Sequence, residues 1–114
     1  MSNLSFDFSD QCVIVTGAAR GIGLAIASFF KDAKATVYMV DMDHAQVDAA
    51  AKTIGAIGIA ADVSSTTDVE RVVAQVIADT GRIDVLVNNA GILRDSVVWK
   101  LSDEDWESVL AVHL

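Results

Sequence analysis

Short apolar runs alternate along the chain with longer segments in which apolar residues recur at helical spacing. The runs are too short for helices and are bounded by glycine, aspartate or asparagine, so each predicts a buried strand. The predicted strands cover residues 12–15, 36–40, 57–60 and 85–88. Between them, apolar residues three and four positions apart predict one buried face on each of three helices. These faces comprise Ile22, Ala25, Ile26, Phe29 and Phe30, then Val47, Ala50, Ala51 and Ile54, then Val69, Val72, Val73, Val76 and Ile77.

Capping residues support the predicted helix boundaries. Thr67 and Glu70 fit a capping box at the start of the third helix, and Gly81 fits its end. Ser102 predicts the start of a fourth helix. The apolar face of that helix would carry Trp106, Val109, Leu110 and His113.

The alternation of strands and helices predicts an α/β fold. Strands buried on both faces and separated by helices form a parallel sheet, and right-handed crossovers make it a doubly wound, Rossmann-like sheet. The last predicted helix reaches Leu114 with no capping residue, and the outer edge of the fourth strand has no partner. We therefore expect residues 1–114 to form a single domain that is truncated after the fourth βα unit.

Composition and charge exclude several classes of partner. The chain carries 8 basic and 16 acidic side chains, for a net charge of −8, which disfavours nucleic acid. Cys12 is the only cysteine, which excludes an intrachain disulfide and a metal site built on cysteines, and its place in an apolar strand predicts core packing. Neither a secretory signal nor an apolar run of about 20 residues is present, so we expect a cytoplasmic protein without a membrane partner.

The stretch VTGAARGIG, residues 15–23, lies where the first predicted strand turns into the first helix. Gly17, Gly21 and Gly23 permit a sharp turn and a close approach of a phosphate to the backbone, and the helix N-terminus supplies free N–H groups. The same glycines also fit a tight turn with close helix–strand packing. Their position directly after the first strand favours a pyrophosphate site.

Polar residues follow the other predicted strands. Asp41 comes directly after the second strand, where its carboxylate can bind both hydroxyls of an adenosine ribose and would repel a 2′-phosphate. This favours NAD over NADP, although a helix cap is an alternative role for Asp41, and Asp43 is interpreted as a solvated helix start. Asp62 and Asn88 mark the ends of the third and fourth strands, at the edge where open α/β sheets bind ligands. The domain is therefore predicted to bind a dinucleotide.

These residues together resemble the short-chain dehydrogenase/reductase family. The resemblance rests on TGAARGIG at 16–23, DV at 62–63 and NNAG at 88–91, and it extends from Asp10 to the end of the chain. It implies that Asp62 and Val63 contact the adenine, while Asn88 and its neighbours line the nicotinamide-side ribose. The full set of implied cofactor-binding residues is Gly17, Ala18, Arg20, Gly21, Ile22, Gly23, Asp41, Asp62, Val63, Asn88, Ala90 and Gly91.

The resemblance also bears on cofactor choice and catalysis. A basic residue at the position of Arg20 often accompanies NADP in this family, but the repulsion expected from Asp41 favours NAD. The family's reaction uses a serine and a Tyr-x-x-x-Lys, which the resemblance places downstream of these residues. Tyr38 is the only tyrosine, it lies in a predicted strand, and the residue four positions later is Met42 and not a lysine. The 114-residue chain alone is therefore expected to be inactive. His113 stands where the family often has an asparagine in the fourth helix, and it can hydrogen-bond a water in the same relay.

The sequence thus predicts the NAD(H)-binding part of an oxidoreductase that transfers a hydride between nicotinamide and an alcohol or carbonyl substrate. Residues 91–114 most resemble family members acting on 3-oxoacyl or 3-hydroxyacyl thioesters, and the family implies a homo-oligomer at full length. The alternative is a non-catalytic NAD-binding or regulatory module, because the serine and Tyr-x-x-x-Lys are absent from these residues. The NNAG stretch disfavours a third hypothesis, a domain for another adenosyl ligand such as a methyl donor.

Overall fold

The computed structural model describes residues 6–89 and 110–113, which contain one parallel sheet of five strands. In chain order the elements are β1 (Cys12–Thr16), α1 (Gly21–Asp32), β2 (Thr36–Asp41), α2 (His44–Ile54), β3 (Ile57–Ala60), α3 (Thr66–Thr80), β4 (Val85–Asn88) and β5 (Leu110–His113). The four strands predicted from the apolar runs are all present.

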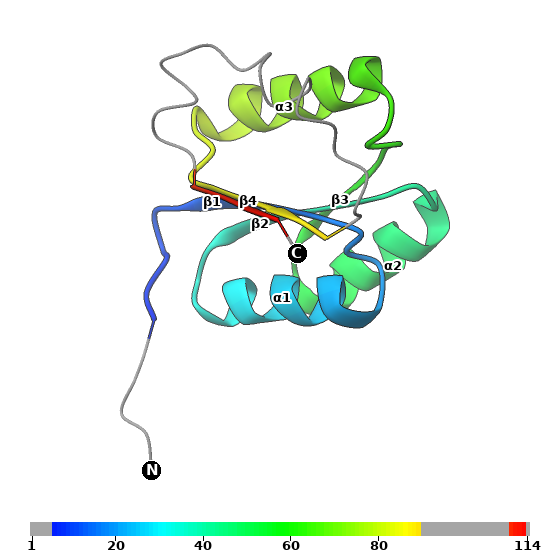
Figure 1. The fold of residues 1–114 in the computed structure, drawn as a ribbon. Helices are drawn as coiled ribbons and strands as arrows, with labels where there is room; N and C mark the ends of the chain where they lie inside the picture. The colour runs from blue at the N-terminus through cyan, green and yellow to red at the C-terminus, as the bar shows by residue number, and fades with distance from the viewer. Residues whose placement is uncertain (1–5, 90–109, 114) are drawn as a thin grey trace.

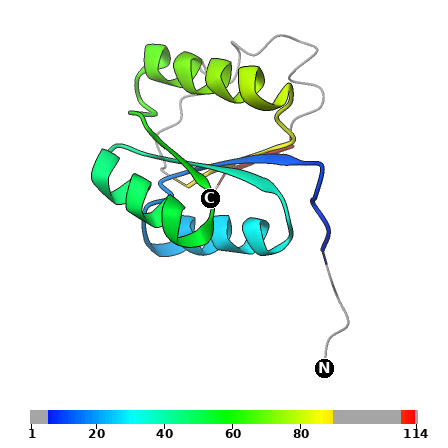
Figure 2. The ribbon, with the colours of Figure 1, turned by 180° about the vertical axis from the view of Figure 1, so that it is seen from behind.

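The sheet has the strand order β3-β2-β1-β4-β5. The chain moves outward from β1 to β3 and then crosses back to place β4 on the other side of β1, so the direction of winding reverses there. Helices α1 and α2 cover one face of the sheet and α3 covers the opposite face, as Figures 1 and 2 show from two sides. This confirms the predicted doubly wound, Rossmann-like α/β fold.

Side-chain alternation divides the core between the two faces of the sheet. One cluster packs beneath α1 and α2, and its strand residues include Val13, Val15, Val37 and Met39. The other cluster packs beneath α3 and comprises Cys12, Ile14, Tyr38, Val40, Ile59, Ala61, Val63, Val72, Val76 and Ile83. Because successive strand side chains point to opposite faces, β1 and β2 contribute to both clusters. Cys12 is 1% exposed, in agreement with the predicted packing role.

The predicted buried face of α1 is confirmed only in part, since Ile26 and Phe30 pack against the core but other members do not. Ile22 and Phe29 are 69% and 46% exposed, and the residues of α1 that are buried are Gly23 and Ala27. Small side chains let this helix approach the sheet closely, so the contact face is centred on residues that hydrophobic spacing does not detect. The predicted faces of α2 and α3 are confirmed, since Val47 and Ala51 are buried in α2 and Val72 and Val76 in α3.

The capping residues of α2 and α3 agree with the sequence in part. Asp43 begins α2, where its side chain accepts a hydrogen bond from the Gln46 N–H, as its interpretation as a helix start implied. Gly81 ends α3 in the left-handed conformation, as predicted. The capping box at Thr67 is wrong, because Ser65 is the N-cap and accepts from the Asp68 N–H. Ser65 has extended backbone angles, whereas Thr67 is already helical.

The end of the chain also differs from the prediction. Residues 110–113 form β5, which pairs in parallel with β4, so the outer edge of β4 is covered and the chain reaches a fifth strand. Leu110 and His113 therefore lie in a strand and not on the face of a fourth helix. A strand there satisfies the N–H and C=O groups that β4 would otherwise leave unpaired. The other residues of the predicted helix, Ser102 to Val109, lie outside the described part of the chain.

Candidate functional site

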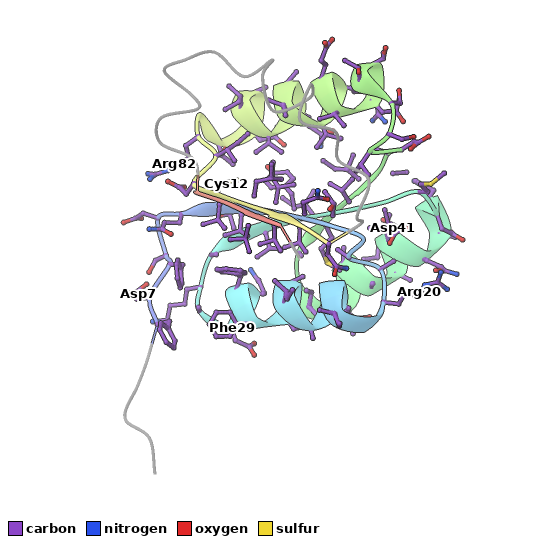
Figure 3. The ribbon with its side chains drawn as sticks, viewed as in Figure 1. Asp7, Cys12, Arg20, Phe29, Asp41 and Arg82 are labelled. Carbon is purple, nitrogen blue, oxygen red and sulfur yellow. The ribbon has the colours of Figure 1, made fainter. Side chains whose placement is uncertain are left out.

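The polar residues singled out in the sequence gather at the carboxyl ends of the strands. Figure 3 shows Arg20 and Asp41 at this end of the molecule, with Cys12 and Arg82 at the opposite end. The ends of β1 and β4 lie side by side here, because Thr16 pairs with Asn88 in the register of the two strands. This is the point where the winding reverses, and a crevice at such a point is the usual ligand site of an open α/β sheet.

The glycine turn between β1 and α1 is closely packed on one side and open on the other. A Cβ atom on Gly23 would lie 2.0 Å from the Gly17 carbonyl oxygen and 2.7 Å from Asn89 Nδ2, so only glycine fits there. Gly17 and Gly21 have positive φ angles of 60° and 61°, and a Cβ on Gly21 would meet nothing within 4 Å. The close-packing interpretation is therefore confirmed for Gly23, the backbone at Gly21 is open, and the pyrophosphate site stays a prediction.

The N-terminus of α1 lacks the side-chain cap that the other two described helices have. Its N-cap residue, Arg20, makes no capping hydrogen bond, and the first turn holds no acidic residue. By contrast, Asp43 and Ser65 cap α2 and α3. The first N–H groups of an uncapped helix are donors for an anion, and the helix dipole adds a partial positive charge. Ile22, in this first turn, exposes its side chain beside these groups.

Asp41 links the end of β2 to the glycine turn. Its Oδ2 accepts a hydrogen bond from the Ala19 N–H at 3.1 Å, and the neighbouring Ala18 N–H donates to the Val40 carbonyl at 3.2 Å. The helix-cap alternative for Asp41 is wrong, because the cap of α2 is Asp43. The Asp41 carboxylate is half-buried against the turn.

A buried polar network joins β1 to the end of β4. Thr16 Oγ1 donates to Asn88 Oδ1 at 3.1 Å and accepts from the Asn89 N–H at 3.1 Å. Asn89 Nδ2 in turn donates to the Gly17 carbonyl at 3.2 Å. Thr16 and Asn89 lie within the sequence motifs, but sequence reasoning missed their role. The available signal was a hydroxyl and an amide at the ends of two strands, because such groups form hydrogen bonds when they are buried. The network holds the glycine turn against the end of β4.

Asp62 follows β3 and closes a tight turn with Ser64. Its Oδ1 accepts from the Ser64 hydroxyl at 2.6 Å and from the Ser64 N–H at 2.9 Å. These two hydrogen bonds to the charged form lower the pKa of the Asp62 carboxyl. An open pocket beside this turn is lined by Met42, Ala60, Ala61, Asp62 and Asp68, and the next residue, Val63, is buried in the core.

The remaining predicted site residues are placed differently. Ala90 and Gly91 lie outside the described residues. His113 lies in β5, opposite Asn88 in the strand register, so its predicted position in a helix is wrong. Among residues 6–89 and 110–113, no three His, Cys, Asp or Glu side chains are grouped so that they could hold a metal ion. No helix in this part of the chain has the length and apolarity needed to cross a membrane.

Comparisons with known proteins point to one family. Its model, described as short chain dehydrogenase, matches residues 11–114. D-threitol dehydrogenase of Mycolicibacterium smegmatis is 39% identical over 98% of the chain and 46% of its own length. Hydroxyacyl-CoA dehydrogenase ChsB1 of Mycobacterium tuberculosis is 37% identical over 95% of this chain and 37% of its own length. The 3-oxoacyl-[acyl-carrier-protein] reductase FabG of Thermotoga maritima is 40% identical over 89% of this chain and 43% of its own length. The chain thus spans less than half the length of these relatives.

Solved structures resemble the fold closely. A short-chain dehydrogenase/reductase of Brucella melitensis, described as a glucose/ribitol dehydrogenase, superposes with a TM-score of 0.77 at 27% identity. The match covers 96% of this chain and 58% of that one. The RhlG/NADP complex of Pseudomonas aeruginosa gives a TM-score of 0.71 at 32% identity over 75% of this chain and 36% of that one.

Proposed function

Because the chain belongs to the short chain dehydrogenase family, we propose that it is the NAD(H)-binding part of an oxidoreductase. The whole protein would transfer a hydride between nicotinamide and an alcohol or carbonyl carbon. The observation that carries the cofactor assignment is the position of Asp41, whose carboxylate lies 3.1 Å from the Ala19 N–H of the glycine turn. In this proposal residues 1–114 act as a single dinucleotide-binding unit.

The residues at the carboxyl edge fit a dinucleotide. The uncapped N–H groups of α1 and the open backbone at Gly21 offer a place for the two phosphates, and Gly23 lets α1 pack close to the turn. Gly17, Ala18, Arg20, Gly21 and Ile22 complete the proposed pyrophosphate site. A phosphate bound here would accept hydrogen bonds from the first N–H groups of α1, to which no side chain of the described residues provides a cap.

Asp41 supports a preference for NAD over NADP. One carboxylate oxygen is already held by the Ala19 N–H, and the other can accept from a ribose hydroxyl. A 2′-phosphate in the same place would bring a second negative charge against Asp41, which costs about 1 kcal/mol or more at roughly 4 Å even in water. Arg20 is exposed and could offset part of this repulsion, so the preference is a matter of relative affinity.

The two ends of the dinucleotide would occupy the neighbouring strand ends. We assign the adenine to the pocket beside Asp62 and Val63, and the nicotinamide side to Asn88, Ala90 and Gly91. The nicotinamide, when bound, supplies the hydride acceptor or donor. This chain's own residues bind and orient the dinucleotide, and Thr16 and Asn89 keep the glycine turn in place.

The proposed substrate is a 3-oxoacyl or 3-hydroxyacyl thioester. Two relatives carry names of this chemistry, the hydroxyacyl-CoA dehydrogenase and the 3-oxoacyl-[acyl-carrier-protein] reductase, whereas a third is named for a polyol. In the oxidative direction, a 3-hydroxyacyl thioester and NAD⁺ would give the 3-oxoacyl thioester, NADH and a proton. We further propose that the whole protein is a cytoplasmic homo-oligomer.

Titration of the protein with NADH, NADPH and S-adenosylmethionine by calorimetry tests the cofactor assignment. We expect NADH to bind tighter than NADPH, and S-adenosylmethionine not to compete with NADH. Failure of both dinucleotides to bind would overturn the proposal. The whole protein is then assayed for NADH formation with 3-hydroxybutyryl-CoA, using D-threitol as the control substrate. Turnover of threitol alone would refute the thioester assignment and leave the cofactor assignment intact.

A further inference from the structure

The turn that carries Asp62 is held from outside by two side chains of α3. The Asp62 N–H donates to Asp68 Oδ2 at 2.9 Å, and Arg71 Nη2 donates to the Ala60 carbonyl at 2.8 Å. Asp68 and Arg71 are three residues apart on the helix, and their charged groups approach to 3.9 Å. One face of α3 therefore bonds both an N–H and a carbonyl of the backbone at the end of β3.

The contact made by Asp68 differs from that of an ordinary capping box. In a capping box, the acidic side chain at the third helical position bonds the N–H of the N-cap residue. Here the N-cap residue is Ser65, whose N–H donates to the Asp62 carbonyl at 2.9 Å instead. The Asp68 carboxylate reaches past Ser65 to the Asp62 N–H, so it holds the turn and not the end of its own helix.

The remaining bonds of the turn engage groups other than the Asp62 N–H. The Asp62 side chain is bonded to Ser64, which fixes it within the turn. One backbone bond, from the Ser65 N–H to the Asp62 carbonyl, joins the turn to the N-cap residue of α3. The Ala61 N–H donates to the Asp41 carbonyl at 3.0 Å, which holds the preceding residue to β2. Asp68 is thus the side chain of α3 that holds the Asp62 N–H, in the pocket that both residues line.

We propose that Asp68 is a positioning residue for cofactor binding, which sets selectivity for the adenine base by holding the Asp62 turn. The inference rests on the proposed function, because Asp62 reads the base only if a dinucleotide binds at this edge. A carboxylate fixed beside the adenine accepts from its exocyclic amino group. Hypoxanthine has an oxygen at that position, which a carboxylate disfavours. Release of the turn lets Asp62 move and weakens this discrimination.

The test compares the Kd values for NADH and for reduced nicotinamide hypoxanthine dinucleotide. We expect the protein to favour NADH by about 10-fold, the size of one charge-assisted hydrogen bond. Asp68→Ala should bring the ratio of the two Kd values close to 1. Asp68→Asn retains an oxygen acceptor for the Asp62 N–H and should keep most of the ratio. If Asp68→Ala does not fold, Asp68→Ser provides the same measurement with a residue that favours helix starts.

Ser65→Ala is the matched control, because it removes the cap of α3 but leaves the bond from the Asp62 N–H to Asp68. Ser65→Ala should lower the thermal stability of the protein and leave the ratio of the two Kd values unchanged. The inference is overturned if Asp68→Ala keeps the ratio, if Ser65→Ala abolishes it equally, or if the unmutated protein does not discriminate between the two ligands. Absence of NADH binding to the unmutated protein would instead refute the proposed function, and this inference with it.

Discussion

The carboxylate of Asp41, at the end of β2, accepts a hydrogen bond from the N–H of Ala19 in the turn between β1 and α1. The acidic group proposed to select the ribose and the turn proposed to hold the phosphates are therefore joined directly. A displacement of one displaces the other. The carboxyl edge of the sheet is one connected unit, because Asn89 bonds the same turn from the side of β4.

Gly23→Ala should disrupt this unit. The added Cβ would lie 2.0 Å from the Gly17 carbonyl oxygen, so α1 or the turn must shift. We expect a loss of about 1–3 kcal/mol in the free energy of unfolding and at least a 10-fold weaker Kd for NADH. Denaturant unfolding and NADH titration measure the two effects.

Gly81→Ala is the control for Gly23→Ala. Gly81 has a φ of 74°, and a Cβ there would meet nothing within 4 Å. The substitution should cost about 1–2 kcal/mol through backbone strain and leave the Kd for NADH unchanged. A Gly23→Ala protein that binds NADH as the unmutated protein does would contradict the proposed close packing.

Lys34→Gly should stabilise the fold. Lys34 has a φ of 75°, and it is the one non-glycine residue with positive φ in the described part of the chain. Its side chain is exposed, so glycine relieves backbone strain with little loss of contact, and we expect a gain of about 0.5–1 kcal/mol. Lys52→Gly, within α2, should cost about 1 kcal/mol in the same denaturation experiment. If Lys34→Gly is no more stable than the unmutated protein, the backbone at Lys34 is not strained.

Asp84 should give the fold part of its acid sensitivity. Burial would raise the pKa of Asp84, but hydrogen bonds from Arg82 and from the Cys12 N–H outweigh burial and lower it below 3.8. The folded pKa is then below the unfolded one, so the unfolded state binds the proton more readily. The stabilisation is fully present above the unfolded pKa near pH 4 and is lost as pH falls through the folded pKa.

Asp84→Asn tests this pH dependence. The variant should be less stable by about 1–2 kcal/mol at pH 7, and the difference from the unmutated protein should shrink below pH 4. Asp48→Asn is the control, because the Asp48 side chain is 47% exposed and pairs with Lys52 on the surface of α2, whereas that of Asp84 is 16% exposed. A difference that stays constant down to pH 2 would contradict the assignment.

Much of the fold could be predicted from the sequence, because buried parallel strands and two of the helices have strong hydrophobic patterns. The face of α1 could be predicted only in part, since close approach to the sheet depends on Gly23 and Ala27, which carry little apolar surface. The strand β5 could not be predicted, because the spacing of Leu110 and His113 fits a helix as well. Pairing with β4 is a tertiary effect that local spacing does not encode.

The sequence predicts where the main residues of the candidate site lie, but it does not predict the hydrogen bonds that support them. The positions of the glycine turn and Asp41 follow from their places at the ends of predicted strands. The bonds of Thr16 and Asn89, and the reach of Asp68 to the Asp62 N–H, depend on distances between elements far apart in sequence. Such distances become known only when the sheet is assembled.

The ratio of the Kd values for NADPH and NADH, measured for the protein and for Asp41→Ala, tests the cofactor assignment most directly. We predict that the unmutated protein binds NADH at least about 10-fold tighter, and that the substitution removes most of this preference because it removes the repelling charge. Asp43→Ala, which removes a nearby acidic helix cap, should keep the ratio. If Asp41→Ala leaves both affinities unchanged, Asp41 does not contact the ribose and the assignment is wrong.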